Sequence, residues 1–327
     1  MLLRITNMRG VDLRVFDFDF DLTWAAFFMN GHEKIYGRFG GRDATSADGY
    51  LTLSGLKYAM RAALNAHRRE LESKPNEAAS VPRTVEQYPD AKRIKADACI
   101  HCHQVYDFHR QVKRAAGAWR LDDVWEYPLP ANIGVVLDVK QGNRVQSVNE
   151  GCPADRAGLR AGDELTEVNG QPAASFADVQ YGLHRAKTEK SVRIAWMRNE
   201  KPHAATLELP EGWRKTDISW RASMWGLEPT PHVYGRDLSA REKRDLGLPE
   251  DGMAFRQGDF VPGPAKMAGI KGGDVIFGID GKTRNLTMLQ FNAFVRLNYK
   301  PGDRITFNLL RDGKRLEIPM TLQKAQP

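Results

Sequence analysis

The chain has little that would place it in a membrane, on nucleic acid or in a disulfide-stapled fold. No run approaches 18 apolar residues, so the sequence predicts no transmembrane helix. The 48 Lys and Arg are interspersed with 41 Asp and Glu for a net charge of +7, which predicts a solvated surface and no nucleic-acid partner. Three cysteines in 327 residues are too few for a disulfide framework.

The first residues also lack the long apolar stretch of a signal peptide. They read MLLRITNMRGVDLRVF, with Leu3, Ile5, Leu13 and Val15 in strand-like alternation. This pattern is typical of the interior of a domain, so we expect the chain as given to begin inside a fold. The length of 327 residues predicts two or three domains, and the mixture of strands and helices described below predicts an α+β multi-domain protein.

An internal repeat dominates the second half of the sequence. PADRAGLRAGDELTEVNG at residues 153–170 matches PAKMAGIKGGDVIFGIDG at residues 264–281 without a gap. The shared proline suits the first turn of a short helix, the shared Ala-Gly suits its end, and Asn-Gly and Asp-Gly are tight-turn dipeptides. Each copy is predicted to hold a strand, a helix and two more strands: 165–168, 176–186, 192–196 and 204–209, then 275–279, 288–297, 305–310 and 316–320.

This order of elements resembles the PDZ domain, in the form found behind the protease of HtrA-type proteins. The resemblance covers residues 128–210 and 222–323 and rests on the repeated PxxxAGxxxGD core. It implies two partly open β-barrels with two helices each, which bind the C-terminus of a partner protein as an added strand. The loops that would hold the terminal carboxylate on backbone N–H groups are Asn132-Ile133-Gly134-Val135 and Met224-Trp225-Gly226-Leu227.

The HtrA resemblance does not bring a protease with it. The chain has no GxSxG or GNSGG-like nucleophile turn, and no Ser, His and Asp stand in the order of a catalytic triad. The sequence therefore predicts a protein without protease activity, and it leaves a redox or electron-transfer role open.

Residues 1–72 are expected to form a separate domain. An apolar strand at 24–29 meets Asn30-Gly31 and a second strand near 34–38. A helix follows, because Leu53, Leu56, Met60, Leu64 and Leu71 recur at helical spacing. Strand, hairpin, strand and helix is the order of the C-terminal half of a thioredoxin fold.

The phrases RITNMRGVDL, FDFDFDLTWAAFFMN and IYGRFGGRD make the whole chain resemble a thioredoxin-plus-PDZ family, some of whose members are selenoproteins. Two features depart from that pattern. Residues 1–67 hold no CxxC pair, and Leu22-Thr23 stands where a thioredoxin has a cis-proline. The resemblance thus implies a partial thioredoxin-like domain, with a signal peptide and a redox Cys or selenocysteine motif encoded upstream of Met1.

A polar segment with Pro75, Pro82 and Pro89, residues 73–97, is predicted to be a linker. Residues 98–127 follow and begin with ACIHCHQVYDFHR, which holds two of the three cysteines and three of the eight histidines. The sequence Cys99-Ile100-His101-Cys102-His103 fits C-x-x-C-H, the c-type haem attachment pattern. In that pattern both thiols bond the haem vinyl groups and the histidine binds the iron.

Four interpretations of this segment remain open. Covalent haem c would use Cys99, Cys102 and His103. A tetrahedral zinc or copper site would combine these three residues with His101 or His109. A redox dithiol needs only the two cysteines, because a CxxC arrangement lowers a thiol pKa. The cluster is structurally incidental in the fourth interpretation.

Other residues are given structural roles. Val105, Phe108, Val112, Ala115 and Trp119 form an apolar helical stripe that suits packing against a neighbouring domain or a haem face. Cys152 is predicted to be a small buried thiol, and His184 and His232 are predicted to be isolated histidines.

Together these features favour a tandem-PDZ adaptor that binds protein C-termini beside a haem c, metal or redox segment. The alternatives are a thiol-disulfide oxidoreductase that uses Cys99 and Cys102, and a PDZ scaffold with a structural zinc. Covalent haem c is attached outside the cytoplasm, so the haem interpretation implies a periplasmic or otherwise exported protein. Without haem, the expected location is the cytoplasm.

Overall fold

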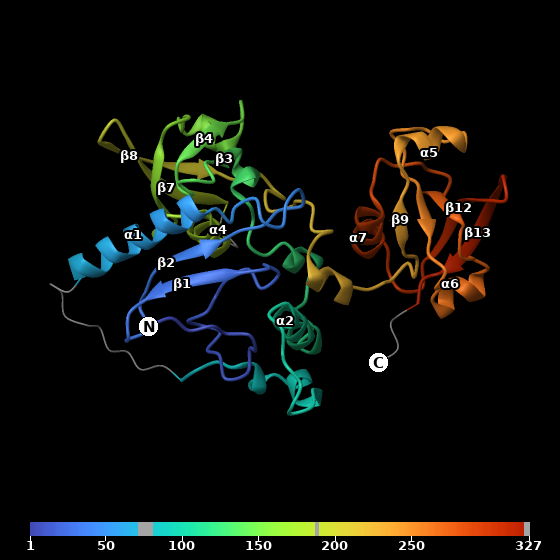
Figure 1. Ribbon diagram of the computed structural model, residues 1–327, viewed down its shortest axis with the longest axis horizontal. Coiled ribbons are helices and arrows are strands. Elements are labelled where there is room, and N and C mark those ends of the chain that lie inside the picture. Colours follow the sequence, from blue (N-terminus) through green and yellow to red (C-terminus); the bar gives the residue numbers. More distant parts are fainter. Residues whose placement is uncertain (71–80, 187–189, 324–327) are drawn as a thin grey trace. The chain divides into compact units, whose positions relative to one another are not determined.

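The structure is a computed structural model that describes residues 1–70, 81–186 and 190–323. The chain divides into two compact units, Met1–Thr216 and Asp217–Pro327, and each unit contains one copy of the repeat (Figure 1). Leu71 and residues 73–80 of the predicted linker lie outside the described residues. Among the described residues, no helix has the length and apolar character needed to cross a membrane.

The first unit opens with an extended segment and a hairpin. Strands β1 (Ala25–Met29) and β2 (Ile35–Gly40) pair antiparallel, and helix α1 (Leu53–Glu70) follows (Figure 1). The predicted strands and helix are confirmed to within about two residues at each end. β1 and β2 form a sheet of their own, so the described residues contain no wider thioredoxin-like sheet around this hairpin.

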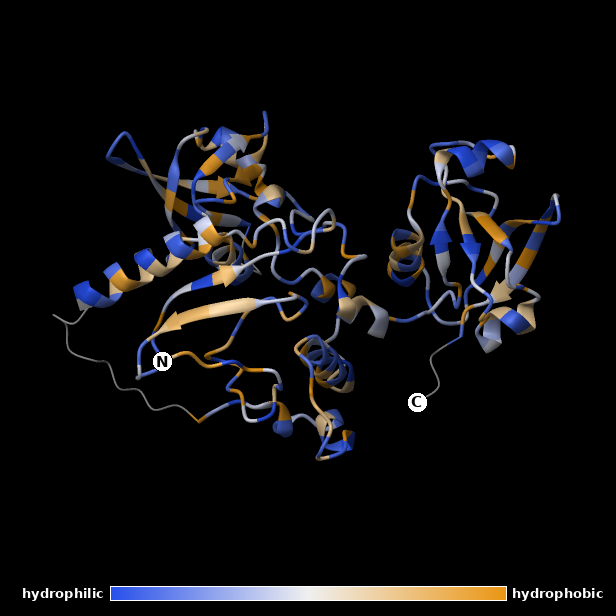
Figure 2. Cartoon of the chain, viewed as in Figure 1, coloured by the Kyte–Doolittle hydropathy of each residue, from blue (hydrophilic) through white to orange (hydrophobic). Residues whose placement is uncertain are grey.

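Helix α1 does not bury the stripe that its sequence suggests. Leu53, Met60 and Leu64 are exposed, whereas Ala59 and Ala63 are buried. Apolar and polar positions alternate along α1, while β1 is apolar throughout (Figure 2). The small side chains let the helix approach β2 closely, and this close packing takes precedence over burial of the larger residues.

The described part of the predicted linker belongs to the folded core. It forms two short 3₁₀ turns, η1 (Val85–Gln87) and η2 (Asp90–Arg93), before α2 (Gln104–Ala115) and η3 (Leu121–Val124). Val85 and Ala91 are 0% and 2% exposed. They share one apolar cluster with residues from the start of the chain and from α2: Met8, Val11, Leu13, Phe20, Ile100, Val105 and Phe108. The linker prediction fails here because the extended N-terminal segment supplies an apolar surface for it to pack on.

The first repeat, residues 128–210, completes this unit. Its elements are η4 (Pro130–Ile133), β3 (Val135–Leu137), β4 (Val145–Val148), α3 (Pro153–Arg156), β5 (Glu164–Val168), β6 (Gln171–Pro172), α4 (Phe176–Arg185), β7 (Ser191–Arg198) and β8 (Lys201–Glu208). β3 pairs with β4, and a second sheet has the order β6-β5-β7-β8. A single bridge between Arg144 and Glu164 joins the two sheets.

The second repeat, residues 222–323, forms one five-stranded sheet of order β13-β12-β11-β10-β9. Its elements are η5 (Ala222–Gly226), β9 (Gly235–Asp237), α5 (Ala240–Asp245), β10 (Phe255–Gln257), α6 (Gly263–Ala268), β11 (Val275–Ile279), α7 (Met288–Asn298), β12 (Arg304–Arg311) and β13 (Lys314–Thr321). The helix α5 between β9 and β10 is an addition to the two predicted helices.

Candidate strand-addition sites beside two helices

The two repeats place equivalent short strands next to equivalent helices. The Asn149 N–H donates to the Gly134 carbonyl in the first repeat, and the Gly258 N–H donates to the Tyr234 carbonyl in the second, both at 2.9 Å. Both residues thus lie directly before an edge strand. Gly134 itself matches His232: Leu137 and Gly235 pair with Val145 and Gln257, which accept from the equivalent Gly162 and Gly273 of the repeat, and Gly134 and His232 both have positive φ. β3 and α4 in the first repeat correspond to β9 and α7 in the second.

Both edge strands have backbone groups that face away from their partners. An antiparallel ladder alternates between hydrogen-bonded and non-hydrogen-bonded pairs. Since Gly134 and Tyr234 are hydrogen-bonded positions, the peptide groups of Val135 and of Gly235 point outward. Among the residues that the structure describes, β9 ends its sheet and β3 pairs with β4 alone. An edge of this kind can accept a further strand.

The structure places only one of the two predicted carboxylate loops beside an edge strand. Asn132-Ile133-Gly134-Val135 leads directly into β3. Met224-Trp225-Gly226-Leu227 lies in η5 and at its end, and residues 228–234 separate it from β9. The loop that enters β9 is instead His232-Val233-Tyr234. It has no glycine to mark it in the sequence, and His232 adopts the left-handed backbone with φ of 57°.

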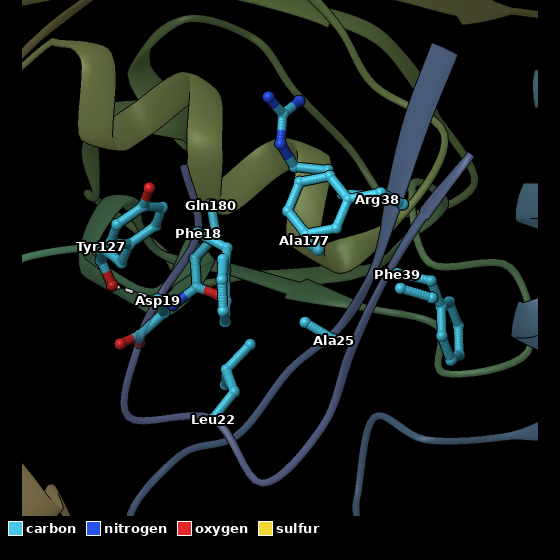
Figure 3. A pocket seen from close by; sticks show the side chains of 11 residues that line it. Phe18, Asp19, Leu22, Ala25, Arg38, Phe39, Tyr127, Ala177 and Gln180 are labelled. Atoms are coloured by element: carbon cyan, nitrogen blue, oxygen red, sulfur yellow. Dashed lines mark hydrogen bonds between the residues drawn. The ribbon is translucent and has the colours of Figure 1, made fainter. Parts of the chain in front are cut away.

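A polar side chain on each helix holds the segment that precedes the edge strand. The Gln180 amide of α4 donates to the Tyr127 carbonyl at 2.9 Å, a contact drawn in Figure 3. The Asn292 amide of α7, at the matching turn, donates to the Val233 carbonyl at 3.2 Å. These contacts fix each approach segment against its helix.

One turn further along, the two helices carry different charges. His184 of α4 stacks on the Tyr127 ring at 4.0 Å, and its Nδ1 lies 3.2 Å from Glu126 Oε2. The prediction of an isolated His184 is therefore wrong. Arg296 of α7 is buried and donates to the Leu227 carbonyl at 2.7 Å. The first repeat also has a guanidinium here, because Arg214 Nε donates to the Trp125 carbonyl at 3.1 Å and its Nη2 lies 3.5 Å from His184 Nδ1. Both approach segments therefore contact an arginine, and the first contains Glu126 as well.

Ionisation near the two loops follows this difference. The Tyr127 hydroxyl donates to Asp17, and burial together with that carboxylate raises the Tyr127 pKa well above its ordinary value. In the second repeat, burial and the nearby Arg296 charge lower the pKa of His232.

The backbone donors of the two loops also differ. In the first repeat, the Asn132 N–H donates to the Leu129 carbonyl at 2.9 Å and the Gly134 N–H to the Ala131 carbonyl at 3.0 Å. In the second repeat, the N–H groups of His232 and Val233 make no hydrogen bond with any residue that the structure describes. Val233 is 0% exposed, so of these two groups only the His232 N–H belongs to a residue that solvent reaches.

A small pocket lies where the hairpin and the segment 18–22 meet α4. Its cavity volume is about 10 Å³, which is room for one water molecule at most (Figure 3). Its lining is mainly apolar: Phe18, Asp19, Leu22, Ala25, Ala26, Phe27, Arg38, Phe39, Tyr127, Ala177 and Gln180. The Arg38 guanidinium continues past it and lies over the Tyr181 ring, 3.5 Å from the centroid. The hairpin therefore covers the outer side of α4.

Cys152 lies beneath the loop that enters β3. Its Sγ accepts the Asp155 N–H at 3.3 Å at the start of α3, and the residue is half-buried. A Cβ on Gly134 would collide with the Sγ and Cβ of Cys152. Gly134 also has φ of 85°, so this position requires glycine for two independent reasons.

The CxxCH segment forms the entrance to α2. Cys99 is exposed and Cys102 is half-buried, while Ile100 between them is completely buried. His103 is the N-cap residue of α2, and its ring lies parallel to that of His101 at 6.0 Å. Burial raises the pKa of the Cys102 thiol, which is opposite to the shift that activates a redox dithiol.

The surroundings of this segment fit a haem only in part. Cys99, Cys102 and His103 could supply two thioether bonds and one axial ligand. The apolar residues Val105 and Phe108, however, are buried in the core cluster, so they are not available to cover a haem ring in this fold.

The alternative zinc set is not gathered into a site. His109 packs on the rings of Phe20 and Tyr88. Within residues 1–70, 81–186 and 190–323, no group of three or more His, Cys, Asp or Glu side chains is arranged to hold a metal ion. The haem and zinc interpretations of Cys99, Cys102, His101, His103 and His109 remain predictions.

Comparison with known proteins agrees with the repeat. Two family models, each described as a PDZ domain, match residues 144–198 and 261–322. The chain carries two PDZ domains of the HtrA/DegP type. They are called PDZ1 (residues 128–210) and PDZ2 (residues 222–323) below. Neither match includes residues 1–127, so the thioredoxin-like resemblance of the front segment is not supported.

The similar curated proteins are longer proteases. The chain is 32% identical over 145 residues to the periplasmic pH-dependent serine endoprotease DegQ of Escherichia coli strain K12, which covers 44% of this chain and 29% of DegQ. It is 28% identical over 196 residues to a probable periplasmic serine endoprotease, DegP-like, of Pseudomonas savastanoi pv. phaseolicola, covering 58% of this chain and 39% of that protein. The chain thus spans less than half the length of these relatives.

Among solved structures, the chain is similar to the HtrA-type protease AlgW with decapeptide. The TM-score is 0.28 at 18% sequence identity, and the match covers 56% of this chain and 55% of that chain.

Proposed function

We propose that this chain is an adaptor without protease activity that binds the C-termini of other polypeptides. The observation that carries the proposal is the outward-facing backbone of an edge strand beside a helix, as in β9 and α7. A ligand strand would add antiparallel to that edge, and its carboxylate would meet backbone N–H groups at the loop that enters the strand. Backbone contacts give affinity with little side-chain selectivity, so the ligand range should be broad.

The adaptor interpretation follows from what accompanies the PDZ domains. The chain has no nucleophile turn of a serine protease, although the relatives are named as serine proteases. Those relatives are also named as periplasmic, which supports a periplasmic location for this chain. We infer that binding, and not cleavage, is the activity of the PDZ part.

A C-terminal peptide library tests this function. Random decapeptides with free C-termini would be selected on the full chain, and the tightest binder would be compared with the same peptide carrying a C-terminal amide. The free acid should bind at least about tenfold more tightly, because the amide removes the charge that the loop donors hold. Equal binding of acid and amide, or no peptide bound at about 1 mM, would overturn the proposal.

A further inference from the structure

The two PDZ domains differ at the point where a ligand would enter. We propose that the front segment of the same chain closes the PDZ1 groove, so that PDZ2 alone captures the C-terminus as a strand added to β9. This inference rests on the proposed function and assigns it to one of the two domains.

The front segment crosses the PDZ1 groove where α4 begins and β3 ends. The Tyr50 ring stacks on the Phe176 ring of α4 with centroids 3.8 Å apart. Two residues later, the Thr52 hydroxyl donates to the carbonyl of Val139, just after β3, at 2.5 Å. Residues 50–52 therefore touch both walls of the groove, and Tyr50 covers the helix surface that an incoming ligand strand would need.

Hydrogen bonds between the Arg38 backbone and side chains at the start of α4 hold the hairpin on the same helix. The Arg38 N–H donates to Asp178 Oδ1 at 2.9 Å, and the Arg38 carbonyl accepts the Ser175 hydroxyl at 2.5 Å. Asp178 and Gln180, which do not belong to the PDZ1 apolar core, are 2% and 1% exposed. A helix buried on its outer side as well as its core side is a built interface, so the front segment and PDZ1 act as one body.

One hydrogen bond crosses the PDZ2 groove, and water can replace the Asp237 side chain as its acceptor. The Met288 N–H, at the start of α7, donates to Asp237 Oδ1 at 2.7 Å. Asp237 is exposed, and its own peptide group lies on the outward side of β9. A ligand strand can form hydrogen bonds with the Asp237 peptide group if the Asp237 carboxylate leaves Met288 and turns toward water.

Amide hydrogen exchange on the unmodified full chain locates the ligand. The probe is the tightest free-acid decapeptide from the library, used at saturation. We expect new protection at residues 232–238 and no change at residues 133–138. New protection at residues 133–138 would overturn the inference while leaving peptide binding intact. A probe that binds nowhere would overturn the proposed function itself.

Two pairs of variants separate ligand binding from folding. Asp237→Pro and Asp237→Ala both lose the side-chain contact with α7, but only proline removes the outward N–H. We expect Asp237→Pro to weaken probe binding at least about tenfold and Asp237→Ala less than about threefold. Equal affinity of the two variants would contradict strand addition at β9.

A second pair of variants tests the closure of PDZ1 by the front segment. Tyr50→Ser removes the ring that covers Phe176, whereas Tyr36→Ser changes a half-buried tyrosine of strand β2 that hydrogen-bonds His67. Amides of residues 176–185 should exchange about tenfold faster in Tyr50→Ser and unchanged in Tyr36→Ser. Unchanged exchange in Tyr50→Ser would overturn the closure.

Discussion

Arg198 donates two parallel hydrogen bonds to the Asp163 carboxylate, from Nε to Oδ1 and from Nη2 to Oδ2, both 2.7 Å long. The same Nη2 donates to the Gly158 carbonyl at 2.7 Å. In PDZ2, Arg311 and Asp274 repeat this two-pronged pair with the same distances. The aspartate of the repeated Gly-Asp motif is thus held by an arginine at the end of a distant strand, which ties the short helix, the turn and the sheet together.

Loss of this arginine should destabilise PDZ1 strongly. Asp163 is only 1% exposed, so Arg198→Met leaves a buried carboxylate without its cation and should cost about 3 kcal/mol of unfolding free energy. The matched control is Arg193→Met on the same strand, because Arg193 pairs with Glu167 in an exposed position and should change stability by about 0.5 kcal/mol or less. Urea unfolding followed by tryptophan fluorescence measures both. Similar losses for the two variants would contradict the special role of the buried pair.

The contact between the hairpin and α4 should weaken as pH rises. Burial raises the pKa of Asp178 from 3.8 to about 6, against the opposing effects of Arg38 and three hydrogen bonds. A carboxyl group that binds its proton more tightly when folded stabilises the fold below pH 4, and this contribution is lost as pH rises through about 6. The shift corresponds to about 3 kcal/mol.

Asp178→Asn isolates this effect. Other carboxyl groups shift in the opposite direction, such as Glu242, whose pKa is lowered to about 2 by Arg236. We therefore expect the difference in unfolding free energy, wild type minus variant, to fall between pH 4 and pH 7. A difference that stays constant across this range would show that Asp178 titrates normally.

Gly134 should tolerate no side chain. Gly134→Ala adds a Cβ that collides with Cys152 and also strains a backbone with φ of 85°, so we expect a loss of about 2 kcal/mol or more. Gly117→Ala provides the control, because Gly117 has φ of 63° and nothing within 4 Å of its added Cβ. Only the cost of the backbone conformation, about 1 kcal/mol, should appear there. Thermal unfolding distinguishes the two, and equal losses would mean that the loop moves away from Cys152.

The CxxCH segment makes a spectroscopic prediction. If the motif is used as its spacing predicts, the chain expressed with a signal peptide in a host with cytochrome c maturation retains haem covalently. A pyridine haemochrome spectrum measures this, and both Cys99→Ser and Cys102→Ser should reduce the covalent yield. A colourless protein would contradict the haem interpretation.

Thiol titration then separates the remaining alternatives. In a protein without haem or metal, Cys99 should react first with a disulfide reagent, because it is exposed whereas burial raises the pKa of Cys102. Zinc bound at one equivalent would protect both thiols. Cys102 reacting first would contradict the burial seen here.

The repeat made the PDZ domains predictable because their signals are local. Gly158 and Gly269 end their helices with φ of 85° and 101°, and Asn169 and Asp280 open tight turns with φ of 50° and 52°. These conformations depend on a few neighbouring residues. The strand that starts at Val275 was placed correctly for the same reason.

What sequence reasoning missed depends on contacts between distant residues. The PDZ2 loop was misplaced because Gly226 looked like the loop glycine, while His232 takes the left-handed conformation without one. Arg38 and Asp178 are 140 positions apart, and no local pattern joins them. Leu53 of α1 was predicted to be buried from its helical spacing, but it is exposed, and the alanines Ala59 and Ala63 are buried in its place. In each case a distant surface decided the outcome.

The shared core of the first unit determines how the protein can be divided. Met8 and Ile100 are joined by a backbone hydrogen bond of 2.9 Å and lie in one apolar cluster, although the predicted domain borders put them in separate segments. A fragment that begins at residue 128 would contain α4 without the hairpin that covers it. The side chains of Asp178 and Gln180, which are buried in the full chain, would then be exposed to solvent. A fragment that begins at Asp217 breaks no such cluster. The second PDZ domain is therefore the part of this chain to produce in isolation, and the first should be handled only together with everything that precedes it.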